Sequence, residues 1–275
     1  MIIKPGTHTL KVRYWVKDLV TNVEGTITKL LPSTAFASNT YYDLTANLDV
    51  RDYDGDHYYM WDAQQQYWYG YEWTKHLPGN TGQPTVEGDS SPNYPQNNSD
   101  NRYYNDSYLG FGISNPATHA SCKDLPNANE LSWYCMFGDP RWDADELWTT
   151  MGHLYKGGMW FKKKSALQAE SHYDTEKSAD GTTDLRTTYK TYDNNHSSIN
   201  SGVPSAADAG NYFFLPALGF YSSGLLIGIG SNGFYWSSSA YPWGSGYAYL
   251  LNFTSGNVYV YSYLRYDGFR AEAFQ

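Results

Sequence analysis

Cysteine and positive charge are both scarce in this sequence. Only Cys122 and Cys135 occur among 275 residues, which excludes a disulfide scaffold and leaves either one pair or two buried thiols. Charged residues make up 17% of the chain, and the formal net charge is −9. Such an excess of negative charge argues against nucleic acid or an anionic membrane as the partner.

Long apolar runs and enzymatic motifs are also missing. No stretch approaches the roughly 18–20 apolar residues that span a membrane, so direct membrane insertion is not expected. The start, Met1–Val12, has no hydrophobic signal region, and we expect any export signal to lie outside this sequence. His119, His153 and His172 lack metal-ligand spacing, and Gly-rich phosphate motifs are absent. We therefore expect no catalytic residues, no metal site and no cofactor.

One acidic segment has the spacing of a calcium loop but not its full pattern. Asp52, Asp54 and Asp56 are spaced as at the start of an EF-hand loop. That loop needs Gly and Glu where this chain has His57 and Ala63. We interpret the segment as a solvated turn.

Aromatic residues are in excess, at 18% of the chain, with 28 Tyr and 10 Trp. Both side chains can be half-buried while a polar tip stays in water, so the excess indicates an extracellular or interface-rich protein. The alternative is a β-rich domain that fills its sheets with aromatic side chains. The two interpretations differ in how many of these rings reach solvent.

The first fifty residues predict strands. Thr9–Val16, Gly25–Leu31 and Tyr41–Val50 alternate polar with apolar residues. Residues 1–50 are thus a β-rich segment with too little core to stand alone, which either pads the next domain or ends a larger β-domain. The segment weakly resembles the C-terminal strands of pilin-like sandwich domains. Anchoring or assembly through it is a hypothesis that follows.

Residues 51–109 predict an aromatic and loop-rich connecting region. Beyond it, Asp124–Phe137 has the capping residues, early Pro and apolar spacing of a helix that stops at Gly138. A second helix is predicted over Asp143–Met151, ended by Lys156–Gly158. Strands are predicted over Met159–Phe161 and Tyr212–Leu218.

Two sets of residues are interleaved from Gly233 to Gln275. The framework set is Trp236, Trp243, Leu251, Phe253, Val258, Val260, Gly268 and Phe269. The second set is Tyr241, Gly244, Gly246, Tyr247, Leu250, Thr254, Tyr259, Tyr261, Ser262, Tyr263, Leu264, Tyr266 and Asp267. Its residue types are those of antibody binding loops, where Tyr supplies rigid contact area and Ser and Gly supply adaptability. We expect the second set to bind a ligand.

Strand periodicity separates the two sets. In Asn257–Tyr261, alternation sends the two valines to one face and the two tyrosines to the other. In Leu250–Thr254, it separates Leu251 and Phe253 from the two end residues. We therefore expect one contiguous solvent-facing patch and one buried set. The patch is Tyr241, Tyr247, Leu250, Tyr259, Tyr261, Tyr263, Leu264 and Tyr266, and the core residues are Trp236, Leu251, Phe253, Val258, Val260 and Phe269.

Several segments resemble a known family, the variable proteins that diversity-generating retroelements diversify. The resembling segments are Leu215–Gly219, Gly230–Gly233, Tyr235–Ser239, Arg265 and Gly268–Arg270, with Pro126–Phe137 and Asp143–Trp148 before them. The family has a C-type-lectin-like fold of the branch that includes the formylglycine-generating enzyme. The resemblance implies an α+β class over residues 110–275, with two helices, a twisted antiparallel sheet and a variable region at about 219–274.

The resemblance also implies a source for the second set. In the family, template Asn codons are copied with errors at adenine, which yields Tyr, Ser, Asp, Gly, Thr, Ile or Leu but never Lys, Glu, Gln, Trp or Met. All thirteen residues of the second set fit. This chain departs from the enzyme branch, which uses late cysteines, because none follows Cys135. The tripeptides of calcium-dependent sugar binding are absent too.

The sequence therefore predicts a ligand-binding protein and not an enzyme. Its expected place is outside the cell or on a bacterial cell surface, as a receptor or adhesin for a protein or glycan. One alternative is a carbohydrate-binding or pilus-tip module of fixed specificity on the same fold. Another is a structural pilin subunit that assembles through residues 1–50 and leaves the tyrosines incidental.

Overall fold

The structure is a computed structural model in which the chain is mostly β-sheet. It describes residues 2–43, 47–72, 82–84, 86–88, 90–106, 116–195 and 198–274. Within those ranges there are two α-helices, and neither has the length and apolar character of a membrane-spanning helix.

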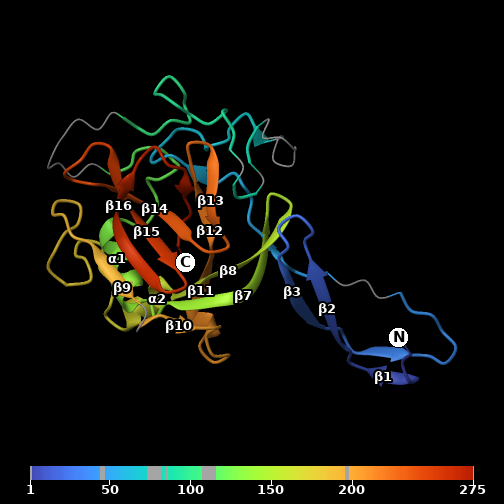
Figure 1. The fold of residues 1–275 in the computed structure, drawn as a ribbon. Helices are drawn as coiled ribbons and strands as arrows, with labels where there is room; N and C mark the ends of the chain where they lie inside the picture. Colours follow the sequence, from blue (N-terminus) through green and yellow to red (C-terminus); the bar gives the residue numbers. More distant parts are fainter. Residues whose placement is uncertain are drawn as a thin grey trace.

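The N-terminal residues form an arm, defined here as residues 2–36, that extends away from the remaining sheets (Figure 1). The arm contains two antiparallel two-stranded sheets. In these, β1 (Gly6–His8) pairs with β4 (Thr34–Phe36), and β2 (Lys11–Lys17) pairs with β3 (Glu24–Leu30). The first two strands predicted from the sequence are therefore confirmed as β2 and β3.

The third predicted strand, Tyr41–Val50, is wrong where it can be tested. Residues 41–43 and 47–50 form no strand, and residues 44–46 lie outside the described part of the chain. In those described ranges the run pairs with no neighbouring strand. Alternation of polar and apolar residues is therefore not sufficient to predict a strand here.

The turn between β2 and β3 packs on the body of the protein. The Asp18 carboxylate accepts a hydrogen bond from the Leu154 backbone N–H at 2.9 Å, and the Thr21 hydroxyl donates to the Leu154 carbonyl at 2.8 Å. Gly25 lies against Leu147, whose Cδ1 would be 2.7 Å from an added Cβ. These contacts fix the base of the arm.

An eight-stranded sheet forms the centre of the body. Its strand order is β13 (Leu225–Ile229), β12 (Leu218–Ser222), β14 (Gly233–Ala240), β15 (Tyr247–Thr254), β16 (Asn257–Leu264) and β9 (Tyr192–Asn195). Off this path, β17 (Phe269–Arg270) joins β14 to β6 (Tyr58–Tyr59). Residues from the predicted connecting region thus become part of the central sheet.

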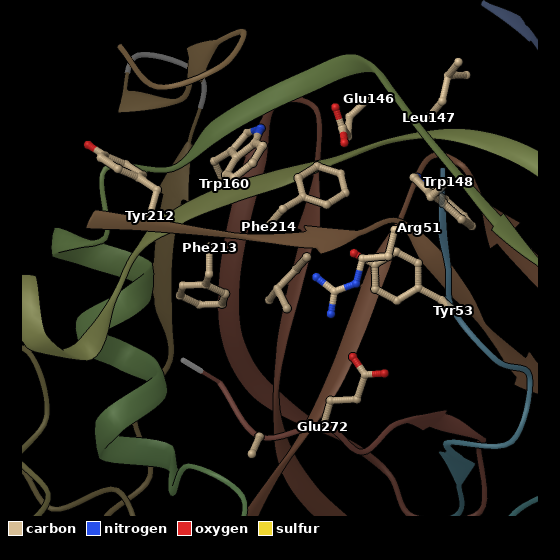
Figure 2. Close-up of a pocket in the computed structure, with 12 residues that line it drawn as sticks. Arg51, Tyr53, Glu146, Leu147, Trp148, Trp160, Tyr212, Phe213, Phe214 and Glu272 are labelled. Carbon is tan, nitrogen blue, oxygen red and sulfur yellow. The ribbon is translucent and has the colours of Figure 1, made fainter. Parts of the chain in front are cut away.

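A second sheet of five strands packs beside the first. Its order is β10 (Asn200–Ser201), β7 (Arg141–Thr150), β8 (His153–Lys162) and β11 (Tyr212–Pro216), with β5 (Arg51–Asp52) also on β7. Near the end strand β11, a cleft of about 270 Å³ opens between aromatic rings and charged side chains (Figure 2). The strands predicted over Met159–Phe161 and Tyr212–Leu218 are confirmed within β8, β11 and the start of β12.

The first predicted helix is confirmed as α1 (Ala128–Phe137). Its capping box is complete, because the Asn127 side chain accepts from Glu130 N–H at 3.1 Å and the Glu130 carboxylate accepts from Asn127 N–H at 2.8 Å. Gly138 follows the last turn and donates to the Tyr134 carbonyl. The sequence did not predict the short helix α2 (Lys164–Ala169) or the 3₁₀ turn η4 (Ala209–Asn211).

The second predicted helix is wrong, because Asp143–Met151 lies largely in strand β7. The Asp143 carboxylate accepts from the N–H groups of Asp145 and Glu146, both at 3.1 Å, as a helix cap would. The chain nevertheless continues as a strand, which pairs with β8 after a register shift between Asp143 and Leu147. The predicted end of this helix, Lys156–Gly158, lies within β8. The capping pattern was real, but it belongs to an irregularity within a β-ladder.

Both faces of the eight-stranded sheet are covered. One face, with Leu251, Phe253, Val258 and Val260, packs on α1 and the five-stranded sheet. The other face, which includes Trp236, packs on a layer formed by Trp61 and by residues in the segment 117–125. The sheet is therefore the middle layer of the body, and the partly exposed residues of β16 are among those that reach solvent.

Candidate functional site

Three tyrosines on β16 form a row along one face of the sheet. Tyr259, Tyr261 and Tyr263 lie two residues apart, so strand alternation points them the same way. Their ring centroids are separated by 6.2 Å and 6.0 Å, and the ring planes are nearly perpendicular, an arrangement that aromatic pairs favour. All three are partly exposed, so this tyrosine row offers both ring surface and hydroxyl groups to a ligand.

On the face that carries the tyrosine row, the residues of β14 and, before Thr254, those of β15 are buried. On β15, Leu250 pairs with Tyr261 and is fully buried beside Trp236 and Phe269. The prediction that Leu250 faces solvent is therefore wrong, because the layer containing Trp61 covers this part of the face. Burial along this face thus decreases from β14 to β16.

Strand register also divides the predicted site between two faces. Ser262 and Leu264 alternate with the tyrosine row, and Leu264 pairs with Tyr247 on the opposite face. Thr254 lies on the same face as the row, at the β15–β16 turn, and is partly exposed. The prediction of one contiguous patch is wrong, since the exposed members occupy both sides of the sheet.

A second aromatic group lies where β14 is connected to β15. This loop cluster is defined as Tyr189, Tyr241, Trp243 and Tyr247. The Tyr241 ring is 5.4 Å from that of Tyr189 and 6.1 Å from that of Tyr247, and the Trp243 ring is 6.3 Å from that of Tyr189. Trp243, which the sequence placed in the framework set, is 46% exposed and belongs to the accessible aromatic surface.

Gly244 and Gly246, two members of the predicted binding set, lie in the connection between β14 and β15 and differ in the space around them. A Cβ added at Gly244 would lie 3.2 Å from the rings of both Tyr241 and Tyr247. A Cβ added at Gly246 would meet nothing within 4 Å, although its carbonyl accepts from Arg265 N–H. Gly246 therefore tolerates exchange more readily than Gly244, which shapes the loop cluster.

Tyr266 lies at a third place, the corner after β16, and is 42% exposed. It borders a cavity of about 300 Å³ together with Tyr94, Gln96 and Tyr103. Those three residues come from the segment that the sequence predicted only as a connection. This corner extends the accessible aromatic surface beyond the predicted set.

Asp267, next to Tyr266, is buried with 2% of its surface exposed. Burial raises the pKa of its carboxyl to about 6, against the opposing effect of a hydrogen bond from Ser222. Its charge in turn contributes, after burial, to the raised pKa of Tyr263 and Tyr266. The prediction that Asp267 offers a carboxylate on the accessible face is wrong, because the side chain is buried.

Arg265 fixes the end of β16 from within. Its side chain is fully buried, its Nε donates to the Tyr247 carbonyl at 2.8 Å, and its guanidinium lies 4.2 Å from the centre of the Trp61 ring. The Arg265 carbonyl also accepts from Trp61 N–H at 2.9 Å. The residue therefore holds the loop cluster and the covering layer at fixed positions.

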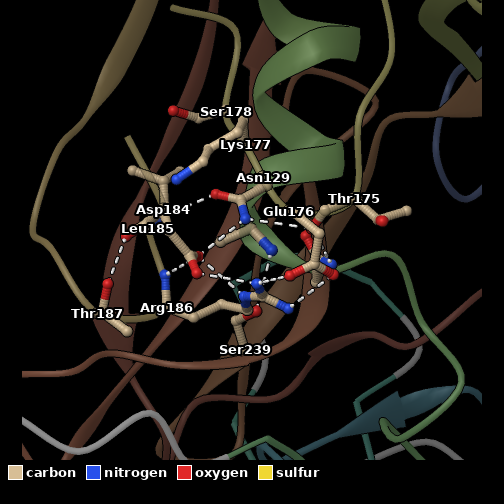
Figure 3. A network of polar contacts seen from close by, with 12 residues as sticks. Asn129, Thr175, Glu176, Lys177, Ser178, Asp184, Leu185, Arg186, Thr187 and Ser239 are labelled. Atoms are coloured by element: carbon tan, nitrogen blue, oxygen red, sulfur yellow. Dashed lines mark hydrogen bonds and ion pairs between the residues drawn. The ribbon is translucent and has the colours of Figure 1, made fainter. Parts of the chain in front are cut away.

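The segment that carries Tyr189 is held on α1 by a polar network (Figure 3). The buried Asn129 amide donates to the Asp184 carboxylate at 2.9 Å. Arg186 pairs with the same carboxylate at 2.8 Å and with Glu176 at 2.5 Å. Because the network links this loop to a helix, Tyr189 is placed beside Tyr241 by rigid structure.

Metal-binding and thiol chemistry find little support. Among the described residues, no group of three or more His, Cys, Asp or Glu side chains is arranged to hold a metal ion. In the acidic turn, Asp54 accepts from Asp56 N–H at 2.9 Å and lies 2.8 Å from the His57 ring nitrogen. Cys122 and Cys135 are free and buried, and burial raises the pKa of Cys122 to about 12.

Comparisons with family models, curated proteins and solved structures return no match for this chain.

The sequence missed Tyr189, Tyr94 and Tyr103 as members of the accessible aromatic surface. Each lies in a segment of Ser, Thr, Asn and Asp that was interpreted only as loop. The available signal was the tyrosines themselves, isolated in polar surroundings where no core was expected.

Proposed function

We propose that this chain is a surface-displayed receptor or adhesin that binds a protein or glycan through the tyrosine row and the loop cluster. In this proposal it lies outside the cell or on a bacterial surface and performs no catalysis. Its domain is C-type-lectin-like, and a retroelement diversifies the accessible residues among positions 219–274.

The observation that carries the proposal is the number of tyrosine and tryptophan rings left in solvent. Tyr247, Tyr266, Trp243 and Tyr189 are each more than 40% exposed, and the tyrosine row is partly exposed on the face of the sheet opposite Tyr247. A solvated strand face normally carries Thr, Lys and Glu, whereas exposed aromatic surface marks interaction sites. Tyr is also well suited to varied ligands, because its ring is rigid and its hydroxyl both donates and accepts.

The rigid scaffold beneath these rings also supports binding. Phe253, Val258 and Val260 are fully buried on the opposite face, and Arg265 locks the strand end. Surface substitutions on such a scaffold typically change stability by less than about 0.5 kcal/mol. Diversification of the accessible residues that do not pack against the inner cluster would therefore leave the fold intact.

The first experiment is a glycan and protein-ligand screen with the wild type and a Tyr259/Tyr261/Tyr263 triple-Ala variant. A control variant removes Tyr41 and Tyr69, which are 86% and 53% exposed and lie outside the proposed site. We expect the triple variant to lose binding, with about 2 kcal/mol or more for each central tyrosine, while the control binds normally.

Binding should also persist in EDTA. Loss in EDTA together with full binding by the triple variant would contradict the proposal and move the site to a metal-dependent position.

A separate test addresses diversification. The coding region should have a near-copy of the 219–274 stretch beside a reverse transcriptase gene, with Asn codons at the exposed positions. Absence of such a copy, combined with binding to one glycan only, would instead support the carbohydrate-binding or pilus-tip module of fixed specificity.

A further inference from the structure

The arm carries an apolar face that the described part of the protein leaves half-open. Val12, Tyr14 and Val16 of β2 lie on the same side as Ile27 of β3, and all four are only partly buried. A two-stranded sheet alone is marginally stable in water. Exposed apolar surface with unpaired strand edges is typical of an element that packs on a partner.

The other face of β2 is cationic and aromatic. Lys11, Arg13, Trp15 and Lys17 alternate along it, and Trp15 is 64% exposed. Lys17 pairs with Glu24 at 3.4 Å. Lys11 and Arg13 form no ion pair with any described residue, so their charges are available to a partner.

The arm and the rest of the chain carry opposite net charge. Residues 1–30 contain five Lys or Arg and two acidic residues, a balance of +3. The remaining residues contain fourteen Lys or Arg and twenty-six Asp or Glu, a balance of −12. The net charge of −9 for the whole chain conceals this division. Because the arm is positive and the rest of the chain is negative, the body of a second copy is an electrostatically suitable partner for the arm.

The cleft on the five-stranded sheet has chemistry complementary to the β2 face. Its walls include the rings of Phe214 and Trp160, whose centroids lie 5.1 Å apart, and Glu146 lies beside Phe214 (Figure 2). Arg51 also lines the cleft, but its guanidinium lies over the Tyr53 ring at 4.7 Å. Glu272 lines the cleft as well, but its carboxylate is paired with Arg270, so Glu146 is the lining carboxylate without a cation partner among the described residues.

The negative charge around Glu146 is only weakly compensated by this chain. Next to Glu146 but outside the lining of the cleft, the Asp145 side chain is 95% exposed, and Lys156 approaches it only to 4.0 Å. Burial and the charge of Asp143 together raise the pKa of Glu146. A cation from a partner placed beside Glu146 would offset the repulsion between the carboxylates of Glu146 and Asp143.

We propose that the cationic face of β2 from one copy of the chain docks into the cleft of a second copy. Lys11 and Arg13 then meet Glu146 and Asp145, and Trp15 packs on the rings that line the cleft. The arm points away from the sheets of its own chain, with β1 at its far end, so this contact is intermolecular (Figure 1). Because two different surfaces meet, the product is a reciprocal dimer or a longer chain.

This inference does not depend on ligand binding by the tyrosine row, since the two surfaces share no residues. Sedimentation velocity on the full chain tests it over a wide range of protein concentration. We expect species larger than the monomer at low salt, and weaker association once the screening length falls to about 10 Å near 0.1 M salt. A wild type that remains monomeric at every concentration would overturn the proposal.

Charge reversal locates the contact. The variant Lys11→Glu/Arg13→Glu should associate about ten-fold more weakly or worse. Its matched control, Lys123→Glu/Lys177→Glu, changes the net charge equally at two exposed positions away from the arm and should associate as the wild type does. Equal loss in both variants would show a general charge effect and contradict the assigned contact.

A complementary pair completes the design. Asp145→Lys/Glu146→Lys should also lose self-association, and mixing it with Lys11→Glu/Arg13→Glu should restore association between the two variants. All these positions are exposed, and unchanged thermal unfolding will show that the variants fold. If the mixture stays monomeric although each variant is folded, the arm does not dock into this cleft.

Discussion

The two faces of strands β14, β15 and β16 differ in how their burial is distributed. On the face toward α1, Leu251, Phe253, Val258 and Val260 are all fully buried. On the other face, Leu250 is fully buried, whereas Tyr261 and Tyr259 are both partly exposed, and of these two only Tyr261 packs against the inner cluster. At these four positions the first face is uniformly buried, although it reaches solvent at its far end, at Tyr247 and Leu264. The second face has a gradient.

This difference shows which positions can vary without loss of the fold. A uniform apolar face allows no exchange of size or polarity at any of its positions. A graded face combines a packed inner part, which orients the strand, with an outer part that is free to change. The following predictions measure that gradient.

The largest effect is expected where burial is complete, on either face. Phe253→Ala should cost about 3–5 kcal/mol, and Leu250→Ala about 2–5 kcal/mol, through lost burial and a cavity. Urea unfolding measures both, with Thr254→Ala at the end of the same strand as a control within about 0.5 kcal/mol. A cost below about 1 kcal/mol for Leu250→Ala would contradict the packed inner part of the graded face.

The second effect concerns the buried carboxyl of Asp267. Its pKa is raised to about 6, so the folded state keeps a proton that the unfolded state releases near 3.8. Stability of the wild type should therefore fall as the pH rises from about 4 to about 6, by roughly 2–3 kcal/mol, and change no further from this group above that range.

Asp267→Asn removes this titration, so its advantage over the wild type should grow across the same pH range. Unfolding curves of both proteins at several pH values give the difference, in which contributions shared with other groups cancel. A constant difference from pH 4 to pH 7 would show that the pKa of Asp267 is not raised in the folded state.

The sequence predicted the uniform face correctly but not the graded one. Alternation assigned Leu251, Phe253, Val258 and Val260 to the core, because period-two patterns report the side of a strand. They cannot report what covers the other side. Leu250 is buried by a layer that includes Trp61, and that contact joins residues far apart in the chain.

Local signals also failed where tertiary pairing overrode them. Asp143 makes the cap-like hydrogen bonds that its sequence predicts, yet the following residues pair with β8 as a strand. The contrast is α1, where the cap of Asn127 and the stop at Gly138 agree with the packing of the helix. A capping pattern indicates a helix only when the apolar residues after it can be buried at helical spacing.

A third, smaller effect is expected in the middle of the gradient. Tyr261 pairs with Leu250, packs against the inner cluster, and has a pKa raised by burial. Tyr261→Ser should therefore cost roughly 1–2 kcal/mol, which alternation alone would not predict. Thermal unfolding checks the value, and a cost below about 0.5 kcal/mol would mean that the gradient begins closer to the sheet centre.

The smallest effect is expected at Tyr259, the matched position two residues earlier on the same strand and face. The centroids of the Tyr259 and Tyr261 rings lie 6.2 Å apart. Tyr259 is not, however, among the residues packed against the inner cluster around Trp236 and Leu250. Tyr259→Ser should change the free energy of unfolding by less than about 0.5 kcal/mol while still weakening ligand binding. Because the same substitution is made at both tyrosines, intrinsic strand propensity largely cancels in the comparison. Equal costs at Tyr259 and Tyr261 would contradict the gradient, and an unchanged ligand affinity in Tyr259→Ser would place the binding site closer to the loop cluster.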